Sequence, residues 1–175
     1  MSELLIFNSI QLFKNKIALC YNGGKDCTVI AHMIYKMNLQ DSVCFVRFNK
    51  EKQFDEINEF AENECKRMNV ELIDLQDYKK GIEELLSRGI NVVLMGCRQS
   101  DFNYKCEEFM FTDKDWPLML RIFPILNWSQ DDVWNYIKTN HVNYCKLYDN
   151  GYTSIGDKDK TKPNFESKEE RAGRK

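Results

Sequence analysis

The chain begins with a segment whose apolar residues recur at a helical spacing. Within residues 3–14 they stand at Leu4, Leu5, Phe7, Ile10, Leu12 and Phe13. Residues three or four apart share one face of a helix, so this spacing favours an amphipathic helix. We therefore predict that the fold begins with a helix over residues 3–14.

The following stretch alternates between short continuous apolar runs and longer periodic segments. The apolar runs predict strands at 16–21, 42–48, 70–75 and 91–95. The periodic segments predict helices at 27–37, 53–68 and 78–87, the last ended by Gly89. Apolar strands separated by helices are typical of βαβ units. The predicted fold class is therefore α/β, an open, mostly parallel, twisted sheet with helices on both faces.

This alternation ends after residue 96. Residues 98–117 are polar and aromatic, as in a loop, and a short apolar strand or turn follows them. Ser129 is a favourable N-cap for another helix, with Asp131 and Asp132 in its first turn as dipole-complementing charges. Residues 157–175 are charged and poor in apolar side chains, so alone they are expected to be disordered.

The composition is that of an ordinary globular domain. The 175 residues are 43% hydrophobic and 30% charged, enough for one domain with a substantial core. The net charge of -2 gives no overall attraction to nucleic acid or to an anionic membrane. No apolar run approaches the roughly 20 residues that span a bilayer, and the apolar start lacks the pattern of a signal peptide. We expect neither a nucleic-acid nor a membrane partner.

The cysteines indicate free thiols rather than bridges or ligands. The seven stand at Cys20, Cys27, Cys44, Cys65, Cys97, Cys106 and Cys145. Their number is odd and no two form a C-x-x-C pair, so reduced thiols in a cytoplasmic protein are the simplest interpretation. His32 and His141 have no cysteine or histidine neighbour at ligand spacing, and we expect both to be structural.

Two adjacent glycines separate the first predicted strand from the next helix, in the stretch CYNGGKDCTV (residues 20–29). Gly23 and Gly24 let the backbone turn tightly and approach a ligand closely. The amides at the helix start then favour an anion, and Lys25 adds a cation. The pattern predicts a phosphate-binding loop, with a plain Gly-Gly turn as the alternative. It is neither a Walker A loop nor a G-x-G-x-x-G fingerprint.

A second polar motif, GCRQSD (residues 96–101), follows the fourth predicted strand. In parallel α/β sheets the ligand site lies at the carboxyl ends of the strands. NGGKD (residues 22–26) and GCRQSD are therefore predicted to meet in space.

The loop and four later segments resemble one family. YNGGKDC (residues 21–27) is similar to the PP-loop of the ATP pyrophosphatase superfamily, S-G-G-x-D-S/T, in the form found in eukaryotic FAD synthases, the FMN adenylyltransferases related to PAPS reductases. The other similar segments, in family order, are GCRQSD, TDKDWPLMLRIFPILNWSQDDVW (112–134), LYDNGYTSIG (147–156) and ERAGR (170–174). Cys97, Gln99 and Phe102 depart from the family pattern. Only residues 157–169 separate the last two segments, fewer than in larger relatives.

This resemblance implies a Rossmann-like fold and a reaction of ATP with FMN that gives FAD and pyrophosphate. The implied cofactor is Mg²⁺, and the implied partners are ATP and FMN, with apo-flavoproteins as recipients of FAD. We expect a monomer with a single domain over residues 1–175. Residues 1–96 would form the nucleotide-binding part, and residues 97–175 the flavin-binding and closing part.

The resemblance also implies roles for individual residues. The ATP and pyrophosphate set is Tyr21, Asn22, Gly23, Gly24, Lys25, Phe48, Arg171 and Arg174. The flavin set is Arg98, Gln99, Ser100, Asp101, Trp116 and Arg121. The catalytic set is Asn22, Asp26, Asp101, Arg171 and Arg174, with Asp26 as a metal ligand. Arg171 and Arg174 are three residues apart, so on a helical turn they would share a face suited to phosphate; the alternative is a solvated basic tail.

Four further aromatic or acidic residues are expected to have structural roles. Trp128 and Trp134 are expected to be structural, and Asp113 and Asp115 to form a turn rather than a metal site. A PAPS or adenylyl-sulfate reductase would need a C-terminal catalytic cysteine, and the chain has none after Cys145. A tRNA-thiolating relative would usually carry C-x-x-C pairs or a basic surface, and neither is visible in this sequence. A nucleotide- or flavin-binding module without turnover stays open as an alternative.

Overall fold

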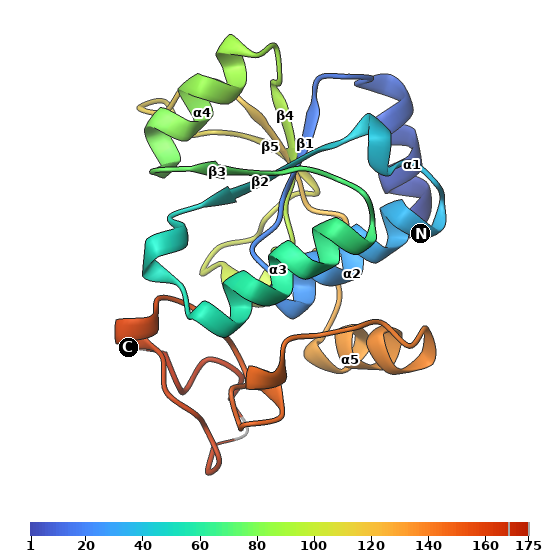
Figure 1. The fold of residues 1–175 in the computed structure, drawn as a ribbon. Coiled ribbons are helices and arrows are strands. Elements are labelled where there is room, and N and C mark those ends of the chain that lie inside the picture. Colours follow the sequence, from blue (N-terminus) through green and yellow to red (C-terminus); the bar gives the residue numbers. More distant parts are fainter. Residues whose placement is uncertain (168, 175) are drawn as a thin grey trace.

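The computed structural model describes residues 1–167 and 169–174; Lys168 and Lys175 lie outside the described part. Its centre is a six-stranded sheet with the order β3-β2-β1-β4-β6-β5. The strands are β1 Ile17–Cys20, β2 Cys44–Phe48, β3 Leu72–Leu75, β4 Val92–Leu94, β5 Phe109–Phe111 and β6 Leu120–Ile122. All neighbours pair in parallel except β5, which runs antiparallel to β6 at one edge. The predicted α/β class is confirmed (Figure 1).

Helices cover both faces of the sheet. They are α1 Ser2–Leu12, α2 Lys25–Lys36, α3 Asp55–Arg67, α4 Tyr78–Ser87 and α5 Gln130–Thr139. Five short 3₁₀ helices lie at Gln40–Ser42, Lys50–Lys52, Gln99–Asp101, Lys146–Tyr148 and Lys158–Lys160. In Figure 1, α4 lies on one side of the sheet and α1, α2 and α3 on the other, and α5 packs against α2. The predicted helix at 27–37 begins two residues earlier, which places Lys25 and Asp26 in its first turn.

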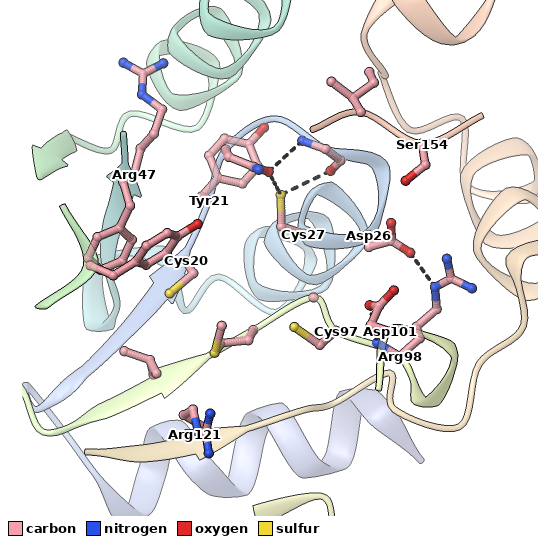
Figure 2. Close-up of a pocket in the computed structure, with 18 of the residues that line it drawn as sticks. Cys20, Tyr21, Asp26, Cys27, Arg47, Cys97, Arg98, Asp101, Arg121 and Ser154 are labelled. Atoms are coloured by element: carbon pink, nitrogen blue, oxygen red, sulfur yellow. Dashed lines mark hydrogen bonds and ion pairs between the residues drawn. The ribbon is translucent and has the colours of Figure 1, made fainter. Parts of the chain in front are cut away.

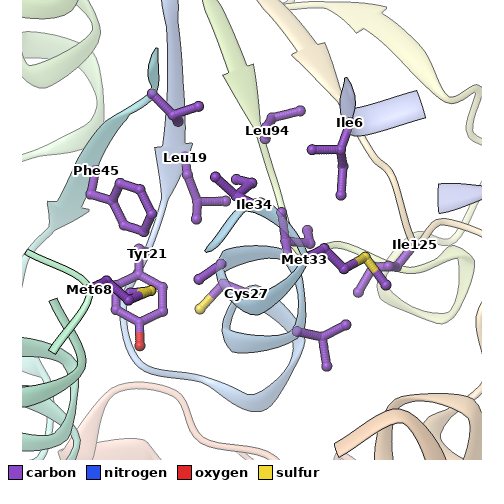
Figure 3. Packing of buried hydrophobic residues seen from close by; sticks show 14 of the residues in the cluster. Ile6, Leu19, Tyr21, Cys27, Met33, Ile34, Phe45, Met68, Leu94 and Ile125 are labelled. Carbon is purple, nitrogen blue, oxygen red and sulfur yellow. The ribbon is translucent and has the colours of Figure 1, made fainter. Parts of the chain in front are cut away.

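The core is divided by the sheet into two apolar layers. Ile17 and Leu19 pack with the residues of α1, α2 and α3, whereas Ala18 between them packs with the residues of α4. This alternation follows from the two-residue period of a strand. Figure 3 shows the larger layer, in which Met33 and Ile34 of α2 meet the strands. Both faces of β1 are therefore buried, as its continuous apolar run predicts.

One sequence expectation was wrong, and a second needs its context. The stretch 98–117, expected to be a loop, contains β5, whose residues pair with β6 ten or so positions later. This edge strand is only three residues long and exposes Phe109 and Phe111, so it is too short for an apolar periodicity to reveal it. The composition of the tail from residue 157 favours disorder only if the tail is taken alone. In the described part of the structure the tail is folded, as a closing segment requires: Thr161 and Arg174 form an antiparallel bridge, and the Lys162 amide donates to the Gly173 carbonyl.

Several local predictions are confirmed. Ser129 caps α5 through a reciprocal capping box with Asp132. The seven cysteines are free thiols. His32 lies on α2 beside the Tyr136 hydroxyl, and Trp128 donates its indole N–H to Ser2. Over the described ranges, none of the helices has the length and apolar character required to cross a membrane.

Candidate active site

A cavity of about 510 Å³ lies at the carboxyl ends of the strands. It sits where the strand order reverses, because the chain runs from β1 to β2 and β3 on one side and then crosses to β4 on the other. Such a switch point is the usual ligand position in open α/β sheets. The loops after β1 and β4 and the C-terminal segment all contribute to its lining, which confirms that NGGKD and GCRQSD meet (Figure 2).

Gly23 is required by the turn rather than by the cavity. Its φ of +80° lies in the left-handed region, and a Cβ there would stand 2.8 Å from the Ile57 carbonyl oxygen of α3. Any other residue would be strained and would push α3 away. Gly23 does not line the cavity, and what the structure shows is its packing against Ile57; its contact with pyrophosphate stays a prediction.

The amides at the start of α2 already have partners. The Gly24 amide donates to Asn22 Oδ1 at 3.0 Å, and the Lys25 amide donates to the Tyr148 hydroxyl at 2.9 Å. Burial raises the pKa of Tyr148 far above its ordinary value, so the hydroxyl stays neutral. In this conformation these two amides are therefore not free to bind a ligand. Tyr148, which the sequence did not single out, occupies that position.

Four charged side chains form a closed ring beside the loop. Lys25 Nζ lies 3.0 Å from Asp26 Oδ2 and 2.5 Å from Glu170 Oε1. Arg98 Nε lies 2.7 Å from Asp26 Oδ1, and Arg98 Nη2 lies 2.5 Å from Glu170 Oε1. The side chains of Lys25 and Arg98 are only 1% and 4% exposed. We call these four residues the buried ring.

The electrostatics of the buried ring favour ionised partners. Burial alone would raise the pKa of Glu170, but Lys25 and Arg98 outweigh it and hold that pKa below its ordinary value. Glu170 is therefore a carboxylate at neutral pH. The sequence pattern gave no spacing rule that could link Glu170 to Lys25, which lies 145 residues earlier.

The two tail arginines line the same cavity but in different ways. Arg171 Nη2 lies 2.6 Å from Asp101 Oδ1, whereas Arg174 donates to the Ile155 carbonyl. They are joined by a turn, with the Arg174 amide donating to the Arg171 carbonyl, rather than by a helix. Burial lowers the pKa of Arg174 from its ordinary value. Both guanidinium groups therefore reach the cavity from one short segment.

An aromatic and amide-lined region adjoins the charged one. Phe48 and Tyr78 stack with ring centroids 5.0 Å apart. A second cavity of about 510 Å³ shares Phe48, Tyr78 and Trp116 with the first. Gln53 Oε1 and Arg121 Nε are buried in the lining of the first cavity, and neither atom has a hydrogen-bond partner among residues 1–167 and 169–174.

Most of the predicted site residues line the first cavity. They are Tyr21, Asn22, Gly24, Lys25, Asp26, Phe48, Arg98, Asp101, Trp116, Arg121, Arg171 and Arg174. Gln99 and Ser100 line neither cavity. The Gln99 side chain instead bonds the Tyr104 carbonyl and the Cys106 amide, and Ser100 is exposed. Their predicted flavin contacts are therefore not supported by this geometry.

The fold and the site together define a doubly wound α/β protein with a charged cavity at a topological switch point. A match to the phosphoadenosine phosphosulfate reductase domain covers residues 16–88 and 78–163. The chain belongs to this family.

The chain is also similar to individual proteins and to a solved structure. The chain is 38% identical to a probable FAD synthase of Caenorhabditis briggsae over 84% of its length and 34% identical to one of Schizosaccharomyces pombe over 85%. It spans 30% and 62% of those proteins. The structure of Candida glabrata FMN adenylyltransferase in complex with FMN and the ATP analogue AMPCPP matches with a TM-score of 0.80 at 22% identity, over 96% of this chain and 66% of that one.

Proposed function

We propose that this chain is an FMN adenylyltransferase, which transfers the adenylyl group of ATP to FMN and releases pyrophosphate. The observation that carries the proposal is the cation set that three distant segments bring to one cavity: Lys25, Arg98, Arg171 and Arg174. ATP and FMN are both polyanions, and neither can bind without such neutralisation. The similarity to probable FAD synthases over 84% of the chain supports this choice of substrates.

The reaction needs little covalent chemistry from the protein. An oxygen of the FMN phosphate bonds to the α-phosphorus of ATP, and the bond from that phosphorus to the oxygen bridging to the β-phosphate breaks. Pyrophosphate leaves with that electron pair. The attacking phosphate is already anionic, because the second pKa of a phosphate monoester is about 6. Catalysis then rests on alignment and charge neutralisation rather than on a strong base.

The charged half of the cavity supplies that neutralisation. In this proposal Lys25, at the start of α2, holds the leaving pyrophosphate, and the positive end of the helix adds to its charge. Arg98 and the two tail arginines are placed to hold the remaining phosphate oxygens, because a guanidinium presents a fork that matches phosphate. Asn22 and Asp101 orient these groups: Asn22 Oδ1 accepts from Gly24, and Asp101 pairs with Arg171.

The aromatic half suits the two ring systems. Phe48, at the end of β2, is stacked by Tyr78 and offers an apolar surface for adenine. Trp116 and the unpartnered Arg121 Nε line the cavity from the segment leading into β6 and from β6 itself, and we assign them to the flavin side. In this proposal residues 1–96 supply most of the nucleotide contacts and residues 97–175 most of the flavin contacts.

Magnesium fits this site only as a companion of ATP. Across residues 1–167 and 169–174, no group of three or more His, Cys, Asp or Glu side chains could hold a metal ion by itself. Mg²⁺ is commonly held by one or two carboxylates and by substrate phosphates, and Asp26 lines the cavity. We propose Asp26 as its protein ligand; the ion would neutralise phosphate charge.

Incubation of the purified protein with ATP, Mg²⁺ and FMN tests the proposal. We expect FAD and pyrophosphate in equal amounts, separated by chromatography and measured by pyrophosphate detection. Binding of FMN and ATP without FAD formation would instead indicate a module without turnover. Sulfite formed from adenylyl sulfate and a thiol reductant would instead indicate a reductase.

A further inference from the structure

The carboxylate of Glu170 lies where a ligand phosphate would bind the two most buried cations of the site. We propose that Glu170 is an internal anion, which occupies this position between Lys25 and Arg98 until a phosphate-bearing ligand displaces it. The proposal deepens the proposed function and rests on it only in taking the ligand to be a phosphate.

The geometry of Glu170 is that of a phosphate substitute. Its Oε1 lies 2.5 Å from Lys25 Nζ and 2.5 Å from Arg98 Nη2, and its Oε2 lies 2.6 Å from the same Arg98 nitrogen. Carboxylates and phosphates accept the same charge-assisted hydrogen bonds from lysine and arginine. A phosphate held by both Lys25 and Arg98 needs the donors that Glu170 now uses. The two anions are therefore alternatives.

Of the two carboxylates in the buried ring, Glu170 is the one that can leave. Asp26 lies in the first turn of α2, where its backbone is fixed by the helix and its charge suits the helix dipole. Glu170 comes from the C-terminal segment, 145 residues beyond Lys25. The two carboxylates are similarly exposed, at 14% for Glu170 and 22% for Asp26, so the backbone position rather than exposure distinguishes them.

The backbone around Glu170 is anchored, so displacement requires only its side chain to move. The Thr153 hydroxyl donates to the Glu170 carbonyl at 2.6 Å. A few residues later the Lys162 amide donates to the Gly173 carbonyl at 2.8 Å. Rotation of the carboxylate away from the cavity therefore leaves the segment, with Arg171, in place beside the ligand.

This arrangement sets which anions enter. Before a ligand binds, Lys25 and Arg98 are each paired with both Asp26 and Glu170, which keeps two buried cations neutralised. An anion must bind the two cations more strongly than Glu170 does. A multiply charged phosphate satisfies this requirement, whereas singly charged anions do not.

The test measures the affinity of the protein for inorganic pyrophosphate by titration calorimetry, without ATP or FMN. Glu170→Gln keeps the size of the side chain but removes its charge, so pyrophosphate no longer competes with a carboxylate. We expect binding about tenfold tighter than in the unchanged protein. Glu169→Gln is the matched control, because Glu169 is the exposed neighbour of Glu170. We expect its affinity to stay within about twofold.

Two results would overturn the proposal. Unchanged or weaker binding in Glu170→Gln would mean that Glu170 positions the cations rather than competing for them. If that variant does not fold, the unchanged protein crystallised with pyrophosphate decides the matter. A phosphate between Lys25 and Arg98 with the carboxylate turned away supports the proposal, and a carboxylate still bound to both cations, or no pyrophosphate there, contradicts it.

The same preparations separate this inference from the proposed function. Tighter pyrophosphate binding in Glu170→Gln without FAD formation by the unchanged protein would support the internal anion and contradict the proposed adenylyltransferase activity. FAD formation by the unchanged protein with no gain in pyrophosphate affinity in Glu170→Gln would support the proposed activity and contradict the internal anion.

Discussion

Two buried arginines, Arg47 and Arg98, are each surrounded by carboxylates, and they do different things. The Arg47 guanidinium bonds Asp74 at 2.7 Å, Glu62 at 3.0 Å and the Asn58 side chain at 3.1 Å. These partners lie on β3 and α3, 11 to 27 residues away. Arg98 bonds Asp26 and Glu170, each 72 residues away on opposite sides in the sequence.

The difference lies in what each network holds together. Arg47 joins β2 to the strand and helix that follow it. It also lines the first cavity, but Figure 2 shows its guanidinium turned away from Asp26 and Arg98. Arg98, in the loop after β4, joins the first turn of α2 to the C-terminal segment, and all three line the cavity. A buried arginine among carboxylates therefore does not by itself mark a functional site. The direction of its guanidinium and the sequence distance of its partners separate the two cases.

The largest expected effect is on activity and comes from the buried ring to which Arg98 belongs. Lys25→Met keeps the length of the side chain but removes a cation of the buried ring that is 1% exposed. We expect FAD synthesis, measured as kcat/KM for ATP, to fall at least about 100-fold, which is about 2.7 kcal/mol of transition-state stabilisation. Lys66→Met, at an exposed position of α3, is the control and should keep full activity. Full activity in Lys25→Met would remove Lys25 from the site.

The next largest expected effect is on the free energy of unfolding and comes from the Arg47 network. Arg47→Met leaves Asp74, Glu62 and Asn58 without their shared donor, and both carboxylates are partly exposed at 41% and 38%. Because water can solvate them, we expect a loss of about 2 kcal/mol in the free energy of unfolding rather than the larger cost of a fully buried pair.

Denaturant titration measures that loss. Arg88→Met, which breaks an exposed pair with Glu84 on α4, is the control and should cost about 0.5 kcal/mol or less. An unchanged midpoint for Arg47→Met would mean that its network contributes nothing to the fold.

A smaller effect tests the tail arginines. Arg174→Ala removes a guanidinium that lines both cavities, and we expect at least a tenfold loss of turnover, about 1.4 kcal/mol, with the fold retained. Lys162→Ala is the matched control, because it lies in the same strand-like pair but exposes its side chain. Equal rates in the two variants would assign Arg174 to the fold alone.

The smallest effect is a pH dependence of stability. The folded pKa of Glu170 lies below its ordinary value of 4.5, so its ion pairs stabilise the protein at and above that pH and are lost as pH falls through the folded pKa. We expect the unchanged protein to exceed Glu170→Gln by about 1 kcal/mol in unfolding free energy, constant from about pH 8 to about pH 5 and shrinking below about pH 4.5. A difference that changes near neutral pH would contradict this assignment.

Much of the architecture was already determined by the sequence, for a physical reason. A strand buried on both faces must be apolar throughout, and a surface helix must be apolar on one side. The runs at β1 and β2 and the periodicity of α4 therefore identified these elements, α4 to the residue. Gly23 was required by a turn that few other residues can make. The order of strands and helices then placed two polar loops at one edge of the sheet.

What only the tertiary structure decided depends on contacts between segments far apart in the chain. β5 is a strand because β6 pairs with it, and the tail is ordered because Thr153 and Lys162 bond its backbone. Glu170 and Tyr148 belong to the site because they meet Lys25, a meeting that no local spacing encodes. Propensity and periodicity are local properties of a chain, whereas a buried ion pair exists only once its partners have been brought together.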